Sequence, residues 1–311
     1  MAKNREIPEV DIIIDEKNGV IREVENPQKL RSKRGHEKRV NRIIYTILIV
    51  MSIVWLAPFV MLVLQSFRTE SGGMVNYVIP KQWGWDNYVF LFTSSNFPRW
   101  YMNTLFIALC CAVLQTIIQL SVSYTLSRMR FRGRKLIMNM ILVLGMFPGF
   151  LTMICLYFLL KQLGLTQEGA VPGLILIYCA SSGMGYYISK GFFDTIPKSL
   201  DESARIDGAT RFQVFKKIIM PMSKPIVIYT VLMAFMAPWG DYVFASYVAF
   251  GKNNSYNVAV GLYDWVNTND YQGYFTRFCA GGVLVAVPVT ALFLALQKYY
   301  VEGVTGGAVK G

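Results

Sequence analysis

The sequence contains a single histidine, His36, and it lies in the polar N-terminal segment. A Ser-His-Asp triad or an H-E-x-x-H zinc motif therefore cannot form among the apolar segments that make up most of the chain. The pattern G-x-x-x-x-G-K-[ST] is also absent, so we expect no phosphate-binding loop in this chain. These absences argue against a membrane-embedded hydrolase, and we expect no catalytic residues.

The five cysteines show no C-x-x-C spacing, which argues against a zinc site and against a disulfide framework. All of them fall inside apolar runs, where a thiol behaves as a small buried residue. We therefore expect neither metal ligands nor disulfides. The cysteines are Cys110, Cys111, Cys155, Cys179 and Cys279.

Charged residues are scarce, at 16% of the chain, whereas 54% of its 311 residues are hydrophobic. The charges are concentrated in a few segments and leave long uncharged runs between them. A helix that crosses a bilayer needs about 20 such residues. We therefore predict an all-α integral membrane protein with six transmembrane helices. The six runs are residues 43–67, 100–127, 136–160, 169–189, 225–250 and 278–297.

The basic residues are distributed unequally between the two sides that six crossings define. Of the 31 Lys and Arg residues, 25 lie on the side of both termini and 6 on the other side. Because basic loops stay in the cytoplasm, we expect both termini to be cytoplasmic. The net charge of +12 then reflects membrane orientation and anionic lipid, and we expect no nucleic-acid partner.

Residues 1–42 form a separate polar tail ahead of the membrane domain, which we place at residues 43–311. Within the tail, Asn18-Gly19 separates two partly alternating segments, as in a β-hairpin. An isolated hairpin is only marginally stable in water. We therefore expect the tail to be disordered, or ordered only against a partner.

A charged segment at residues 194–225 separates two uncharged runs and must be an aqueous loop. Ser199 and Glu202 have the spacing of a capping box at the start of a short helix. Gly208 is expected to end that helix. A second amphipathic segment at residues 212–220 is ended by Pro221 and Pro225. The pattern predicts two short helices joined at a glycine on the membrane surface.

This segment resembles the EAA loop of binding-protein-dependent ABC importer permeases, and most closely the sugar-importer pattern. It departs from that pattern at Ser203 and Met220, which replace Ala and Leu. The resemblance implies the type I ABC importer permease fold and a cytoplasmic loop, here named the coupling loop, that docks on the ATPase. The coupling residues that it implies are Ser199, Glu202, Ser203, Ala204, Asp207, Gly208, Ala209, Phe215 and Pro221. An ordinary basic loop that only fixes orientation is the alternative.

The resemblance covers roughly residues 43–311 and extends to the second membrane subunit of maltose-type transporters. Residues 298–311 look like the cytoplasmic C-terminal tail of that subunit, which inserts along the ATPase dimer. The implied partners are a second homologous permease subunit, two ATPase subunits and an extracytoplasmic sugar-binding protein in a bacterial cell membrane. ATP and Mg are used by the ATPase, so this chain is expected to bind no cofactor and to be no enzyme itself.

The fifth apolar run contains the only ionisable side chain well inside any run, Asp241. With Trp239 and Tyr242 it forms a candidate sugar contact that combines an acceptor with aromatic faces. A structural carboxylate is the alternative. Gly240 replaces the Asn of the family pattern W-N-[DE]-[FY]. The side-chain amide that this pattern would offer to a sugar is therefore missing here.

The substrate suggested by the resemblance is a malto-oligosaccharide. An ABC importer for another solute, such as a galacto-oligosaccharide, a sugar alcohol or glycerol phosphate, remains open. An ion-coupled secondary carrier that uses Asp241 is the alternative from another class.

Overall fold

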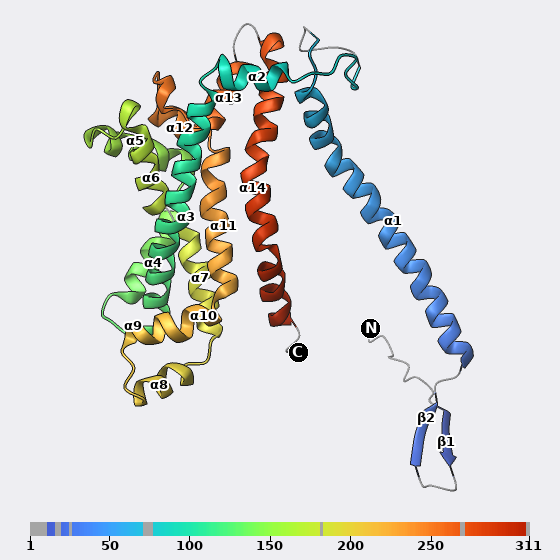
Figure 1. The fold of residues 1–311 in the computed structure, drawn as a ribbon. Helices are drawn as coiled ribbons and strands as arrows, with labels where there is room; N and C mark the ends of the chain where they lie inside the picture. Colours follow the sequence, from blue (N-terminus) through green and yellow to red (C-terminus); the bar gives the residue numbers. More distant parts are fainter. Residues whose placement is uncertain are drawn as a thin grey trace. The chain divides into compact units, whose positions relative to one another are not determined.

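The computed structural model describes residues 11–15, 20–24, 27–70, 77–180, 183–267 and 271–308, with side chains described at 38–70, 77–180, 183–267 and 273–299. The chain divides into two compact units, Met1–Met61 and Leu62–Gly311, and the division falls inside the first helix. The ribbon in Figure 1 labels the elements of both units.

The elements follow one another in this order. They are β1 (Asp11–Asp15), β2 (Val20–Val24), α1 (Pro27–Ser66), α2 (Asp86–Thr93), α3 (Phe97–Arg128), α4 (Arg134–Gly145), α5 (Gly149–Gln162), η1 (Gln167–Gly169), α6 (Ala170–Ala180), α7 (Gly183–Thr195), α8 (Ser199–Ile206), α9 (Arg211–Val214), the π-helical turn η2 (Phe215–Ile219), α10 (Met220–Met222), α11 (Lys224–Gly240), α12 (Val243–Val248), η3 (Asn253–Ser255), α13 (Val258–Val266) and α14 (Tyr271–Ala308).

The first unit contains an antiparallel hairpin and most of α1. Strands β1 and β2 pair with Asp11 opposite Val24 and Asp15 opposite Val20. The hairpin that the Asn18-Gly19 pattern allowed is therefore present, although that dipeptide itself lies outside the described residues. Apart from this hairpin the described elements are helical, and the all-α membrane fold is confirmed.

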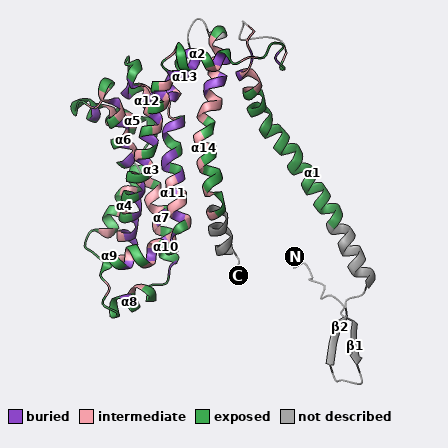
Figure 2. Ribbon diagram, viewed as in Figure 1, coloured by how far each residue is buried: buried purple, intermediate pink, exposed green. Residues whose placement is uncertain are grey.

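The membrane crossings are visible as long apolar helices with little burial inside the chain. Four stretches have the required length and composition, namely Lys38–Ser66, Phe97–Arg128, Gln167–Thr195 and Gly273–Tyr299. Two bent helix pairs bring the number to six if each is one crossing. Figure 2 shows α1 as largely exposed. Trp55 illustrates this, because 71% of it is exposed, as expected of a surface that contacts lipid.

Two of the expected spans are broken. Helices α4 and α5 meet at 105° at the Gly145–Gly149 segment, where Pro148 precedes α5, so the kink expected there is a sharp corner. Helix α11 stops at Gly240, and Asp241 is extended (φ −80°, ψ 99°) before α12 begins. Both breaks coincide with Gly, Pro or a charged residue inside an apolar run.

Helix α3 lies at the centre of the second unit and packs against α6, α7, α11 and α13. The buried residues form three clusters along it. Ile107 and Cys111 of α3 belong to one cluster, Trp100 and Ala108 to another, and Leu120 and Tyr124 to the third. In Figure 2 the purple buried residues gather on α3 and α11 accordingly. The third cluster also contains the coupling loop.

A buried amide joins three helices in this unit. The Gln119 side chain of α3 donates from Nε2 to the carbonyl oxygen of Gly185 (3.0 Å) and to Ser189 Oγ (2.8 Å), both in α7. It also lies 3.4 Å from Thr230 Oγ1 of α11. A Cβ at Gly185 would lie 2.8 Å from Gln119 Oε1, so a larger residue there would displace the Gln119 amide.

Candidate functional site

The coupling loop folds as α8, α9, η2 and α10 between the long helices α7 and α11. Figure 1 shows α8 beyond α9 at the end of the helical bundle. The segment Arg211–Met222 meets α11 at 84°, so it turns sharply away from the axis of that helix. The two short helices joined at a glycine that the sequence predicted are therefore present.

The start of α8 differs from the sequence prediction. Lys198 occupies the cap position with helical backbone angles and makes no side-chain cap. The amides of Asp201 and Glu202 donate instead to the Lys198 carbonyl, at 3.0 and 3.1 Å. Ser199 is already the first residue of α8, where its hydroxyl cannot adopt the geometry of a cap. The capping box predicted at Ser199 and Glu202 is wrong.

The end of α8 agrees with the prediction at Gly208, which has a φ of 81°. The amide of Gly208 donates to the Arg205 carbonyl at 3.1 Å, and the amide of Ala209 donates to the Ala204 carbonyl at 2.9 Å. These two bonds form a Schellman motif, which needs a left-handed residue at the position of Gly208. Glycine adopts this conformation without steric cost.

The capping box of the loop lies at the next helix. Thr210 caps α9: the Gln213 amide donates to Thr210 Oγ1 at 3.3 Å, and the Thr210 amide donates to Gln213 Oε1 at 2.7 Å. The signal was present in the sequence, because Thr-x-x-Gln is also a capping-box pattern. It fixes the start of α9 immediately after the Gly208 turn.

The inner face of the loop packs into a core shared with the long helices. Ala204 of α8 and Val214 of α9 are buried with Leu120 and Tyr124 of α3. The ring of Phe215 packs on that of Tyr124 with centroids 4.6 Å apart. Among the predicted coupling residues, Ala204, Ala209 and Phe215 belong to this core.

Arg128, at the end of α3, ties three elements together. Its guanidinium donates from Nη2 to the carbonyls of Phe193 (2.8 Å) and Ile196 (2.7 Å), which lie at the end of α7. Its Nη1 lies 3.2 Å from Asp201 Oδ2 in the first turn of α8, and only 5% of its side chain is exposed. In the sequence Arg128 is one of the 25 basic residues on the side of the termini, and no local pattern indicates this role.

The outer face of the loop is exposed. Ile206 is 86% exposed, and Leu200 on the same helix is 36% exposed. Two apolar side chains of α8 are thus accessible on an otherwise charged loop. The remaining predicted coupling residues are exposed too, namely Ser199, Glu202, Ser203, Asp207, Gly208 and Pro221.

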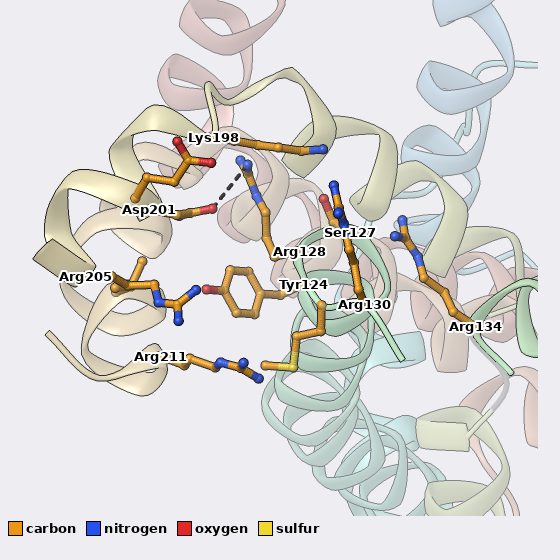
Figure 3. Close-up of a pocket in the computed structure, with 12 residues that line it drawn as sticks. Tyr124, Ser127, Arg128, Arg130, Arg134, Lys198, Asp201, Arg205 and Arg211 are labelled. Carbon is orange, nitrogen blue, oxygen red and sulfur yellow. Dashed lines mark ion pairs between the residues drawn. The ribbon is translucent and has the colours of Figure 1, made fainter. Parts of the chain in front are cut away.

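A cavity of about 420 Å³ lies between the end of α3 and the coupling loop. Figure 3 shows its polar side chains, with Arg128 directed at Asp201. The lining residues come from the end of α3, the segment that follows it, α8 and α9. They are Tyr124, Ser127, Arg128, Met129, Arg130, Arg134, Lys198, Asp201, Glu202, Arg205, Arg211 and Val214.

The three predicted substrate residues lie at the opposite end of α11, and the structure separates them. Trp239 is buried, at 5% exposure, among Tyr101 and Phe235. Asp241 accepts a hydrogen bond from the Tyr178 hydroxyl through Oδ2 and one from the Phe244 amide through Oδ1 (3.1 Å). Both carboxylate oxygens of Asp241 are therefore engaged by groups of this chain.

Tyr242, the third predicted substrate residue, lines a cavity of about 230 Å³. Its ring lies 4.0 Å from that of Tyr263 between centroids, at an interplanar angle of 37°. Tyr256, Asp264 and Asn267 also line this cavity. It therefore combines aromatic faces with a carboxylate and an amide.

Comparison with known proteins identifies the family. The family described as "Binding-protein-dependent transport system inner membrane component" matches residues 119–305, which is more than half of the chain. The chain belongs to this permease family. It is therefore a membrane-embedded subunit of a binding-protein-dependent transport system, as the EAA-like pattern indicated.

Relatives of the permease cover most of its length. It is 35% identical over 268 residues to the maltodextrin transport system permease protein MdxG of Bacillus subtilis, covering 86% of this chain and 95% of that protein. It is 35% identical over 272 residues to the galactooligosaccharides transport system permease protein GanQ of the same organism, covering 86% and 94%. Identity to the maltose/maltodextrin transport system permease protein MalG of Escherichia coli is 31% over 274 residues, covering 82% and 90%.

Solved structures support the fold of the permease. A chain of a bacterial ABC transporter involved in the import of the acidic polysaccharide alginate aligns with a TM-score of 0.70 at 22% identity, covering 85% of this chain and 98% of that one. A second alginate transporter structure, in complex with an alginate pentasaccharide-bound periplasmic protein, aligns with a TM-score of 0.63 at 17% identity, covering 85% and 97%. At these identities the likeness concerns the fold.

Proposed function

We propose that the permease is one of two homologous membrane subunits of an ATP-driven oligosaccharide importer. The relatives at 35% identity are named for maltodextrin and for galactooligosaccharides, and they share nearly the whole chain. A six-helix subunit is too small to enclose an oligosaccharide path alone, which favours a pair of such subunits. The family assignment does not support an ion-coupled carrier, because the family is that of binding-protein-dependent transport systems.

The coupling loop is the part of the permease that we assign to the ATPase. Its outer face offers Leu200 and Ile206 as exposed apolar contacts, and the nearby Glu202 is exposed as an ionic contact. Its inner face shares a core with α3, α7 and α11. A displacement of α8 would therefore be transmitted to these three membrane helices through packed side chains. This continuity from an exposed helix to the membrane core is the observation that carries the proposal.

The orientation follows from the same assignment. The ATPase is cytoplasmic, so the loop and both termini must be cytoplasmic as well. The excess of Lys and Arg on the side of the loop, 25 against 6, favours this arrangement. The cavity at Tyr242 then lies toward the outside, where sugar arrives from the binding protein.

Malto-oligosaccharides are our first choice of substrate and galacto-oligosaccharides the second. Tyr242 and Tyr263 provide faces on which a pyranose ring stacks, while Asp264 and Asn267 supply acceptors and donors for its hydroxyls. We assign no direct sugar contact to Trp239 or Asp241, because Trp239 is buried and the Asp241 carboxylate accepts a hydrogen bond from Tyr178.

The test is uptake into proteoliposomes that contain the permease together with its sister subunit, ATPase and binding protein. We expect ATP-dependent uptake of labelled maltotriose that persists when the pH gradient is collapsed. Uptake of galactobiose in place of maltotriose would select the second substrate. Uptake driven by a proton gradient without ATP would contradict the proposal.

Docking of the ATPase is tested separately by copurification. Ile206→Glu places a charge on the exposed face of α8, and we expect the ATPase to be lost from the purified complex. Leu163→Glu is the matched control, because Leu163 is 57% exposed but follows α5 and lies outside the coupling loop. Retention of the ATPase by Ile206→Glu would show that α8 is not the docking helix.

A further inference from the structure

The cavity beneath the coupling loop has no ligand assigned to it by the transport function proposed above. At about 420 Å³ it lies within the range of about 300–1,000 Å³ that is typical of small-ligand sites. Its walls come from elements far apart in the sequence: the end of α3 and the segment after it on one side, and α8 and α9 on the other.

The cavity is strongly cationic. Six of its lining residues are Arg or Lys, and two are carboxylates. Within the described part of the chain, Arg128 alone among the six forms an ion pair, with Asp201. The Nε atom of Arg128 is buried and has no hydrogen-bond partner among the described residues. The basic side chains therefore outnumber the carboxylates that could neutralise them within the cavity, and the Arg128 guanidinium is partly buried.

The arrangement of the arginines suits an anion that offers several oxygens at once. In Figure 3, Arg205 and Arg211 lie on one side of the Tyr124 ring, and Arg130 and Arg134 lie on the other. A guanidinium presents paired donors that match two phosphate oxygens, and a phosphate has oxygens for more than one guanidinium. A carboxylate has only two oxygens, so it offers fewer acceptor positions to arginines on two sides than a phosphate does.

The position of the cavity fits the same chemistry. It lies where α3 ends and the apolar surface of the helix gives way to charged residues. Basic pockets between helices at the cytoplasmic membrane surface bind phosphate headgroups of anionic lipids. The cavity also lies next to the loop that we assign to the ATPase, so a bound anion would hold α8 and α9 against the end of α3.

We propose that this cavity binds a phosphate-bearing anion between the arginines of the α3–α4 segment and those of the coupling loop. The phosphate belongs either to an anionic phospholipid or to a free phosphorylated metabolite. A bound phosphate bridges Arg130 and Arg134 to Arg205 and Arg211, and it stiffens the connection through which α8 moves the membrane helices.

The experiment measures binding to the complete purified importer in two arms. In the first, native mass spectrometry counts phosphatidylglycerol retained by the complex, with phosphatidylcholine as the neutral comparison. In the second, calorimetry measures inorganic phosphate and glycerol 1-phosphate binding to complex held in phosphatidylcholine nanodiscs. Binding in the first arm identifies a lipid headgroup as the source, and binding in the second identifies a soluble phosphate.

The variant Arg130→Gln/Arg134→Gln is expected to weaken binding at least tenfold. Arg132→Gln is the matched control, because Arg132 is exposed on the same segment and does not line the cavity. It should bind as the unmodified complex does. Arg211→Gln, with exposed Lys216→Gln as its control, tests the other wall and serves if the double variant fails to assemble.

Three results would overturn the proposal. The first is that the unmodified complex retains neither phosphatidylglycerol nor soluble phosphate. The second is that the cavity variants bind as tightly as the unmodified complex. The third is that Arg132→Gln loses as much affinity as Arg130→Gln/Arg134→Gln, which would indicate a diffuse charge effect. These readouts do not depend on sugar transport, so they stand apart from the test of the importer function.

Discussion

The rings of Tyr124 and Phe215 pack against one another with centroids 4.6 Å apart, although the residues come from different parts of the chain. Tyr124 lies near the end of the long helix α3, and Phe215 lies in the π-helical turn of the coupling loop. This contact therefore packs the loop directly against a membrane helix.

Tyr124→Ala removes the ring on which Phe215 rests. Replacing a large buried aromatic residue with alanine costs about 3–5 kcal/mol of unfolding free energy. We expect a lowered thermal midpoint of the purified complex and loss of sugar-stimulated ATP hydrolysis. Tyr124→Phe keeps the ring and should retain both. Equal behaviour of the two variants would show that ring packing is not what connects loop and helix.

The Arg128–Asp201 ion pair is predicted to stabilise the junction of α3, α7 and α8. Arg128→Met leaves the Asp201 carboxylate without its partner and frees the carbonyls of Phe193 and Ile196. Removing one member of a buried pair costs about 3–5 kcal/mol. Arg128→Met/Asp201→Leu should be less destabilised than the two single variants combined. A thermal-stability double-mutant cycle measures this coupling, and strictly additive losses would contradict it.

Gly208 is predicted to be needed for its backbone conformation and not for space. A Cβ there would meet nothing within 4 Å, but the left-handed backbone costs a non-glycine residue about 1–2 kcal/mol. Gly208→Val should reduce sugar-stimulated ATP hydrolysis, because a β-branched residue resists this conformation. Gly208→Asn should retain most of it, since asparagine tolerates left-handed angles. Full activity of Gly208→Val would remove the turn from the mechanism.

Replacing Thr210 or Ser199 with alanine is predicted to have different effects on the coupling loop. Thr210→Ala deletes the hydroxyl that caps α9 and is expected to cost about 1 kcal/mol of local stability. Ser199→Ala should have almost no effect, because Ser199 does not cap α8. Amide hydrogen exchange in α8 and α9 measures both. Faster exchange in Ser199→Ala than in Thr210→Ala would restore the cap assigned from the sequence.

The sequence was informative wherever the determinant is local. Gly208 could be placed in a turn because only glycine commonly adopts the left-handed conformation that ends such a helix. Gly145 and Pro148 marked the corner between α4 and α5 for a similar reason, although the pattern gave no measure of its 105° angle.

The sequence failed where a cap depends on where the helix actually begins, and where partners lie far apart in the chain. Ser199 and Thr210 both begin a capping-box pattern, but Lys198 takes the cap position of α8, so only Thr210 caps its helix. Arg128 meets Phe193, Ile196 and Asp201 only after α3 and α7 have packed, so no spacing rule could identify it. The apolar runs likewise could not show that Trp239 is buried whereas Tyr242 lines a cavity.

The Gln119 amide has a consequence for biosynthesis. The ribosome completes α3 before it has made α7 and α11, which carry the groups that receive the Gln119 N–H bonds. In a bilayer, an amide without hydrogen-bond partners is costly. The free energy of placing α3 in lipid is therefore less favourable for the isolated helix than for α3 packed against α7 and α11. We therefore expect newly synthesised α3 to stay beside the insertion machinery until α7 and α11 have been made.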